Sequence, residues 1–125
     1  MKYREELPID CPPHDAEDVA AEMAVFRLVR DNPPTDEDFR SQRAEFPNRG
    51  FPVDECTTRG LSVFSQEKEA KEKILKIHRL RNHLICHVKL KSGAGKIRKS
   101  SGSSHITWWP FANFDILACC NIKKP

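Results

Sequence analysis

Alternation of hydrophobic and polar residues is the clearest pattern along the chain, and it predicts β-strands. Residues 84–90 (LICHVKL) alternate without interruption, which is typical of a strand with one buried face. The apolar residues expected on that face are Leu84, Cys86, Val88 and Leu90. By composition and by the turn residues around them, we expect further strands at residues 23–29, 61–64, 96–99, 105–109 and 114–122.

Two segments have helical features instead. Residues 66–78 carry Glu and Lys at i,i+4 spacing, with an apolar stripe formed by Ala70, Ile74 and Ile77. A second helix is predicted from Asp36 to Glu45, because Thr35 is a good N-cap and acidic residues fill the first turn. Phe39 is the main apolar anchor of this helix.

The order of these elements predicts the fold class. A strand, a helix, a strand and a helix precede a run of strands, which is typical of an α+β protein with a mostly antiparallel sheet and two main helices. Residues 1–22 are polar and contain prolines, so we expect an N-terminal arm before a single α+β domain at 23–125. Residues 46–60 read as a loop, since Pro47 and Pro52 cannot donate to a β-ladder.

Composition narrows the setting of the protein. The chain has 125 residues, 38% of them hydrophobic, and a mean hydropathy of −0.61. It has no apolar stretch near the roughly 20 residues that a membrane helix needs, and no signal-peptide pattern follows Met1. The five cysteines are odd in number and lack metal-binding spacing, which indicates structural thiols and a reducing cytoplasm.

Charge is distributed unevenly along the chain. Residues 1–60 hold 8 basic and 14 acidic side chains, a net charge of −6, whereas residues 61–125 hold 13 and 4, a net charge of +9. The basic side chains are joined by histidines in a set made of His78, Arg79, Arg81, His83, Lys89, Lys91, Lys96, Arg98 and Lys99. This set could bind phosphate or nucleic acid, or it could pair with the acidic half of the same molecule.

The common catalytic motifs (GxSxG, HExxH and the phosphate loop) are absent from the sequence. Three strand positions nevertheless carry residues that are candidates for binding or catalysis. Arg27 lies among apolar residues in mid-strand, where a guanidinium needs an anion or carbonyls. Ser62 follows Arg59 and a glycine into a strand, which suits a residue beside a bound ligand, and we expect Arg59 to contact that ligand as well. The last position is one strand face, suited to a nucleotide or base, that carries His105, Thr107 and Trp109.

These positions belong to longer motifs that resemble known proteins. The segments concerned are FRLV at 26–29, DF at 38–39, EC at 55–56, RGLSVF at 59–64 and SHITWWP at 104–110. Over roughly residues 24–120 they resemble a group of small, uncharacterised bacterial proteins. The chain also loosely resembles the ADP-ribosyltransferase fold of bacterial toxins and phage-defence effectors.

The second resemblance implies a function. In that family an Arg on the first strand and a Ser motif on a later strand hold NAD, and Arg27 and Ser62 match these positions. A Glu near the chain end completes the family's site, but the only acidic residue after Glu72 is Asp115, so His105 would stand in its place. The resemblance therefore implies NAD or nucleotide binding by Arg27, Ser62, His105 and Trp109, either in a catalytic site or in a degenerate, ligand-binding one.

Two other functions fit the sequence. The basic second half could make the protein a nucleic-acid-binding module, whose affinity would fall steeply with salt. The protein could also be a non-catalytic interaction partner, such as an antitoxin. NAD or nucleotide binding, in contrast, requires Arg27, Ser62 and His105 to meet in one cleft.

Overall fold

The computed structural model describes residues 2–122, which form an antiparallel sheet of seven strands in the order β1-β5-β6-β3-β2-β4-β7. The predicted α+β class is thereby confirmed. The strands are β1 (Glu17–Asp18), β2 (Met23–Val29), β3 (Leu61–Phe64), β4 (Leu84–Leu90), β5 (Gly95–Lys99), β6 (His105–Pro110) and β7 (Cys120–Ile122). No helix within residues 2–122 is long and apolar enough to cross a membrane.

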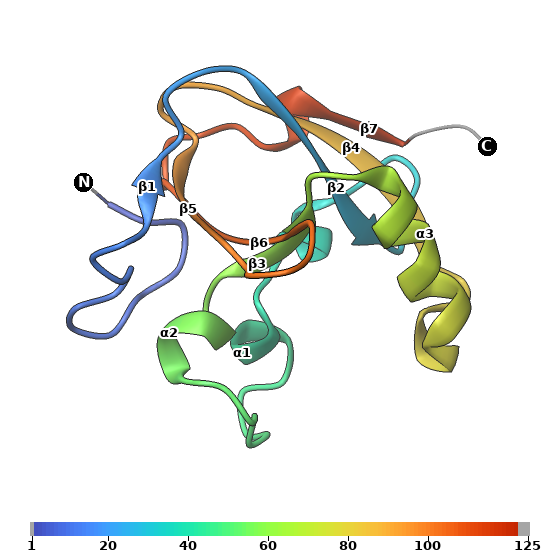
Figure 1. The fold of residues 1–125 in the computed structure, drawn as a ribbon, viewed down its shortest axis with the longest axis horizontal. Helices are drawn as coiled ribbons and strands as arrows, with labels where there is room; N and C mark the ends of the chain where they lie inside the picture. The colour runs from blue at the N-terminus through green and yellow to red at the C-terminus, as the bar shows by residue number, and fades with distance from the viewer. Residues whose placement is uncertain (1, 123–125) are drawn as a thin grey trace.

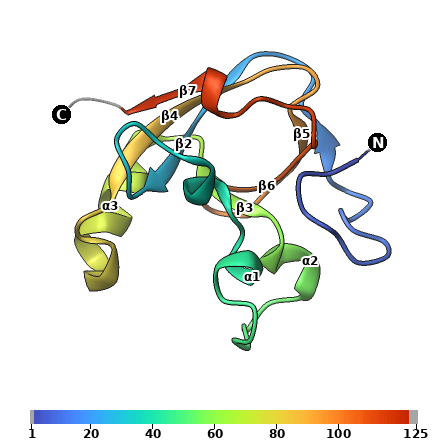
Figure 2. The same ribbon diagram turned by 180° about the vertical axis from the view of Figure 1, so that it is seen from behind.

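The sheet curls around its own core (Figures 1 and 2). One strand face turns inward and buries the alternate residues that the sequence pattern selects, such as Val63 on β3 and Val88 on β4, both fully buried. Trp108 on β6 is fully buried among them, and its indole Nε1 donates to the Ala94 carbonyl at 3.1 Å. The core thus lies inside the curl, and the opposite strand face is free to carry polar residues.

The predicted strands agree closely with the observed ones except near the ends of the sheet. Leu84 is 37% exposed rather than buried, because it is the first residue of β4 and lies at the end of the core. The strand predicted at 114–122 is shorter: a 3₁₀ turn, η3 (Leu117–Cys119), precedes β7.

Helix α3 (Glu67–Lys76) lies outside the curl against β2, β3 and β4 (Figure 1). Ala70 is fully buried there, and the expected i,i+4 pair of Glu67 and Lys71 forms at 3.0 Å. The helix is shorter than predicted, because Ile77 leaves the helical conformation and a separate 3₁₀ turn follows, η2 (His78–Leu80).

The single helix predicted from Asp36 to Glu45 is wrong. The chain forms a 3₁₀ turn, η1 (Asp36–Phe39), becomes extended at Arg40, and starts again as α1 (Gln42–Glu45). The new start has its own cap, since the Ser41 hydroxyl accepts from the Ala44 N–H at 3.1 Å. The Ser41 N–H and hydroxyl in turn donate to the Glu5 carboxylate at 2.8 and 2.6 Å. Phe39 is fully buried, as expected.

The segment 46–60 is more ordered than a loop, because it contains α2 (Glu55–Thr58) with Asp54 as its N-cap. The Glu55 carboxylate accepts hydrogen bonds from Arg43 and Arg59, and these bonds hold the pKa of Glu55 below its usual value. The α1–α2 lobe, residues 41–59, is therefore tied together by side chains.

The N-terminal arm is fastened to the domain at both ends. Tyr3 forms a β-bridge with Phe111, and β1 pairs with β5. Between these points a disulfide joins Cys11 to Cys56, with 5.5 Å between their Cα atoms. Our expectation of unpaired thiols is therefore wrong for these two cysteines, because a pair separated by 45 residues leaves no local trace in the sequence.

Gly95 offers a test of the close approach between β5 and β6. Its φ is +137°, and a Cβ placed there would collide with the Trp109 carbonyl oxygen on the neighbouring strand. We expect Gly95→Ala to lower the free energy of unfolding by about 3 kcal/mol in urea denaturation. Gly50→Ala is the matched control, since no atom lies within 4 Å of its added Cβ. Equal stability of the two variants would contradict the strand packing.

Candidate functional site

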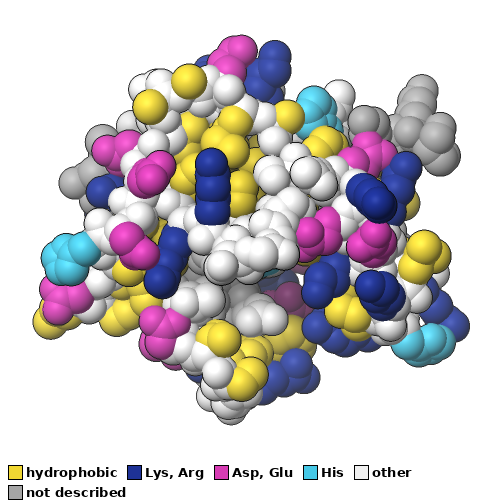
Figure 3. Space-filling view, viewed as in Figure 1, with side chains coloured by type: hydrophobic (Ala, Val, Ile, Leu, Met, Phe, Trp, Pro, Cys, Tyr) yellow, Lys and Arg dark blue, Asp and Glu magenta, His cyan; other side chains and the backbone are white. Residues whose placement is uncertain are grey.

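A cleft lies between the outer face of the sheet and the α1–α2 lobe. Its volume is about 280 Å³. The space-filling view shows a hollow at this place, with basic side chains gathered on the side of α3 (Figure 3). The lining residues are Arg27, Arg40, Ser41, Gln42, Glu45, Val53, Thr57, Gly60, Ser62, His105 and Thr107. Four predicted site residues, Arg27, Ser62, His105 and Thr107, therefore meet in one cleft.

Ser62 and His105 form a close pair on neighbouring strands. Ser62 is exposed on β3, and its Oγ lies 2.6 Å from Nε2 of His105 on β6. The other imidazole nitrogen, Nδ1, lies 2.7 Å from Oγ of Ser100. The backbone N–H of Ser100 also donates to the His105 carbonyl at 2.9 Å, which keeps Ser100 beside the ring. Each imidazole nitrogen therefore has a serine hydroxyl within hydrogen-bond distance.

The surroundings of His105 favour its neutral form. Burial lowers the pKa of the imidazole, and the positive charge of Lys73 lowers it further, while Glu69 acts in the opposite direction. Glu69 is itself held by the backbone N–H and hydroxyl of Ser104, at 2.8 and 3.0 Å. The ring of Phe64 meets the imidazole edge-on, with 5.7 Å between ring centroids, and covers it. At neutral pH the ring can therefore accept a proton.

Arg27 has a structural task as well as a place in the cleft. Its Nε, Nη1 and Nη2 atoms donate to the carbonyls of Asp38, Ser62 and Arg40 at 3.1, 2.8 and 3.0 Å. Burial lowers the pKa of the guanidinium to about 10, so it stays charged at neutral pH. Three of its five N–H groups are thus used within the protein, which leaves two for a ligand.

Sequence reasoning missed Arg40 and Glu45. Arg40 is exposed at the break between η1 and α1, and its guanidinium has no hydrogen-bond or ion-pair partner within residues 2–122. Glu45 lines the cleft from α1 and pairs with Arg30. Neither residue has a local signal in the sequence, because both belong to a segment that reads as an ordinary polar helix.

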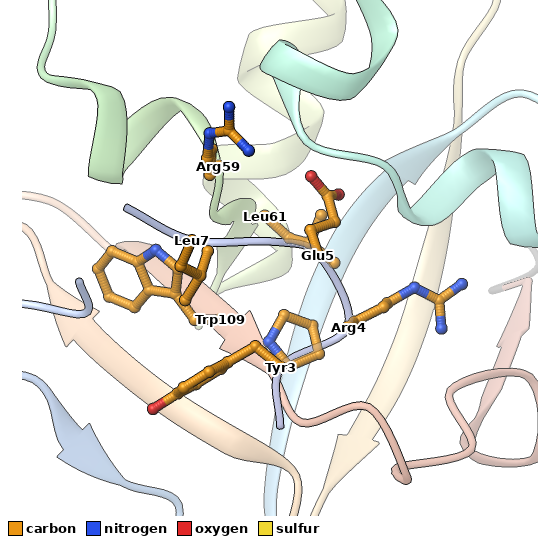
Figure 4. A pocket seen from close by; sticks show the side chains of 8 residues that line it. Tyr3, Arg4, Glu5, Leu7, Arg59, Leu61 and Trp109 are labelled. Carbon is orange, nitrogen blue, oxygen red and sulfur yellow. The ribbon is translucent and has the colours of Figure 1, made fainter. Parts of the chain in front are cut away.

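The remaining predicted ligand-binding residues, Arg59 and Trp109, lie outside this cleft. Trp109 is 1% exposed, and its Nε1 donates to the Cys56 carbonyl at 2.9 Å. Figure 4 shows Leu7 of the arm beside the indole, with Arg59 across the arm from it. Arg59 binds the Glu6 carbonyl at 2.7 Å in addition to Glu55. Arg59 thus ties the arm to α2, and Trp109 is buried beside Leu7 of the arm, so the expected cleft wall at Trp109 is covered.

The basic second half is partly matched by the acidic first half. Lys96 lies 3.9 Å from Asp18, and Arg98 lies 3.2 Å from Asp15. These two pairs bring the acidic arm onto β5, as one of the two sequence interpretations expected.

Comparisons with protein-family models, curated proteins and solved structures found no match. Within residues 2–122, no group of three or more His, Cys, Asp or Glu side chains is placed to hold a metal ion. The cleft and its lining side chains are therefore the features of the described residues that bear on function.

Arg27→Met tests the structural task of this side chain. Met has similar length but cannot donate, so three carbonyls lose their partner, and we expect the free energy of unfolding to fall by about 3 kcal/mol. Arg27→Lys should lose less than Arg27→Met, because an ammonium can still donate to some of the three carbonyls, whereas Met can donate to none. Urea denaturation measures both variants. Arg98→Met, at an exposed ion pair, should change stability by less than about 1 kcal/mol. A loss at Arg27→Met no larger than this control would refute the assignment.

Proposed function

We propose that the protein binds a nucleotide, or the nucleotide half of a molecule such as NAD, in the cleft between the sheet and the α1–α2 lobe. The observation that carries this proposal is the convergence of Arg27, Ser62, His105 and Thr107, which come from three strands, with the unpaired guanidinium of Arg40. A cation beside several hydroxyl and imidazole groups suits a ligand that has both phosphate and sugar hydroxyls.

The polar groups suggest how the ligand divides between them. Arg40, whose guanidinium has no partner within residues 2–122, would take the phosphate together with the two unused N–H groups of Arg27. Ser62, His105 and Thr107 would face the sugar. The cleft volume of about 280 Å³ lies at the low end for small-molecule sites, which favours a mononucleotide or one half of NAD over a whole dinucleotide.

ADP-ribosyl transfer remains a prediction that builds on this binding site. The resemblance to ADP-ribosyltransferases leaves the position of the family's late Glu without a carboxylate. Two groups that line the cleft would take the place of that Glu: the imidazole of His105, as expected, and the carboxylate of Glu45 on α1. A toxin or phage-defence role rests on the resemblance alone.

Titration calorimetry with AMP, ADP-ribose and NAD tests the proposal. We expect AMP or ADP-ribose to bind, and Arg40→Ala to weaken binding at least roughly tenfold through loss of a charge-assisted contact to phosphate. Arg79→Ala is the matched control, since Arg79 is an exposed arginine on η2 that does not line the cleft. It should leave the affinity unchanged.

Two outcomes of the calorimetry would contradict the proposal. Absence of binding by all three ligands, or equal loss in Arg40→Ala and Arg79→Ala, would refute nucleotide binding in this cleft. Binding of RNA or DNA that weakens steeply with salt would support the nucleic-acid alternative instead. Incubation with NAD and detection of free nicotinamide then separates a transferase from a binding protein.

The predicted cytoplasmic location stays a prediction, and the disulfide weighs against it. A disulfide persists in oxidising compartments, whereas Cys11 and Cys56 would be thiols in a reducing cytoplasm. Alkylation of the protein in its cells of origin, followed by mass spectrometry, would show which form these two cysteines take.

A further inference from the structure

The contact between Ser62 and His105 supports a chemistry that ligand binding does not require. We propose that Ser62 is a nucleophile, that His105 is its general base, and that the cleft catalyses hydrolysis of small carboxylic esters through an acyl-serine. This activity is independent of nucleotide binding, because any compact ester that enters the cleft would serve as substrate.

The geometry supplies the three parts that such a nucleophile needs. Ser62 Oγ and His105 Nε2 are 2.6 Å apart, within the range for proton transfer along a hydrogen bond. When Nδ1 carries the ring proton and donates to Ser100 Oγ at 2.7 Å, Nε2 is left as an acceptor for the Ser62 proton. Ser100 thus orients the base, as a third residue does in other serine nucleophile sites.

Access and charge in the cleft agree with this role. Ser62 is exposed, so its hydroxyl meets solvent and ligands, whereas His105 is partly buried and kept neutral. Two cations line the same cleft and are available to the negative charge that develops on the carbonyl oxygen: Arg27, with two unused N–H groups, and Arg40, whose guanidinium has no partner within residues 2–122. The orienting group is a hydroxyl and not a carboxylate, so the imidazolium is stabilised less and slow turnover is expected.

Each step balances within these residues and water. Ser62 Oγ bonds to the ester carbonyl carbon while its proton passes to His105 Nε2. The C–O bond to the leaving group then breaks, and the departing alcohol takes that proton. Water attacks the acyl-serine and gives a proton to Nε2, after which the acid leaves and Ser62 Oγ recovers its proton from His105.

A fluorophosphonate probe tests the nucleophile without a known substrate. Attack by Ser62 forms an Oγ–P bond and breaks the P–F bond, so fluoride leaves and the serine proton passes through His105 to solvent. Intact mass should show one added phosphonyl group, and peptide mapping should place it on Ser62. The Ser62→Ala variant should stay unlabelled, and the wild-type protein should also hydrolyse p-nitrophenyl acetate with an initial burst.

The base and its orienting group are tested by the labelling rate. His105→Gln can still form hydrogen bonds but takes up no proton, so we expect at least a roughly hundredfold loss. Ser100→Ala should slow labelling less, and Ser101→Ala, an exposed serine in the following turn, should leave it unchanged. Since the pKa of His105 is lowered, labelling should be constant at neutral pH and fall only as pH drops below about 6.5, where the imidazole takes up a proton.

Three results would contradict the assignment of Ser62 as a nucleophile. Labelling of another residue, absence of labelling in a folded protein, or equal rates in wild type and His105→Gln would overturn the proposal and leave the contact as a bond between two strands. Circular dichroism establishes that each variant is folded. AMP binding is measured on the same samples, so loss of labelling with retained binding rejects only the nucleophile, and the reverse rejects only the nucleotide site.

Discussion

The arrangement of the molecule around the cleft depends on the guanidinium of Arg27. Strands β2 and β3 share the pair Phe26 and Phe64 and then separate, and Arg27 occupies the place where they part. Its planar group replaces the missing strand partner of the Ser62 carbonyl and also binds two carbonyls at the break between η1 and α1. One partly buried cation therefore holds both the place where the two strands part and the path of the segment that covers it.

This constraint explains why the cleft contains the groups it does. The chain is extended at Arg40 and α1 starts anew after its N-cap Ser41, so the guanidinium of Arg40, which has no partner in the described part of the chain, lines the cleft. The pairing of β3 with β6 then sets Ser62 beside His105 on the outer face of the sheet. The two proposals for this cleft therefore draw on one shared set of lining side chains, which the strand pairing and the carbonyl contacts of Arg27 position.

Local patterns were sufficient for the central strands and for the face that Ser62, His105 and Thr107 share, because alternation is a property of neighbouring residues. They did not predict β1 within the arm or the shortness of β7, and these two are edge strands of two and three residues. They were insufficient where a distant group intervenes. The helix predicted from Asp36 to Glu45 is interrupted by carbonyl contacts to Arg27 and by Glu5, which binds Ser41 across 36 positions in the chain. Arg40 gained its place in the cleft only through that interruption. Trp109 has the expected strand face, but the arm that covers it could not be placed from its own composition.

The arm has a consequence for how the protein reaches this structure. The carbonyl of Lys2 accepts from the N–H of Ala112, and Tyr3 bridges to Phe111, so two segments that are far apart in the sequence pair with each other. Contacts of such sequence separation are slow to form, because a long loop must close before they are gained. During synthesis, the arm can take its place only after residues 111 and 112 have emerged. A nascent chain stalled before residue 105 would contain both Cys11 and Cys56 but would lack β6, whose Trp109 binds the Cys56 carbonyl in the folded protein.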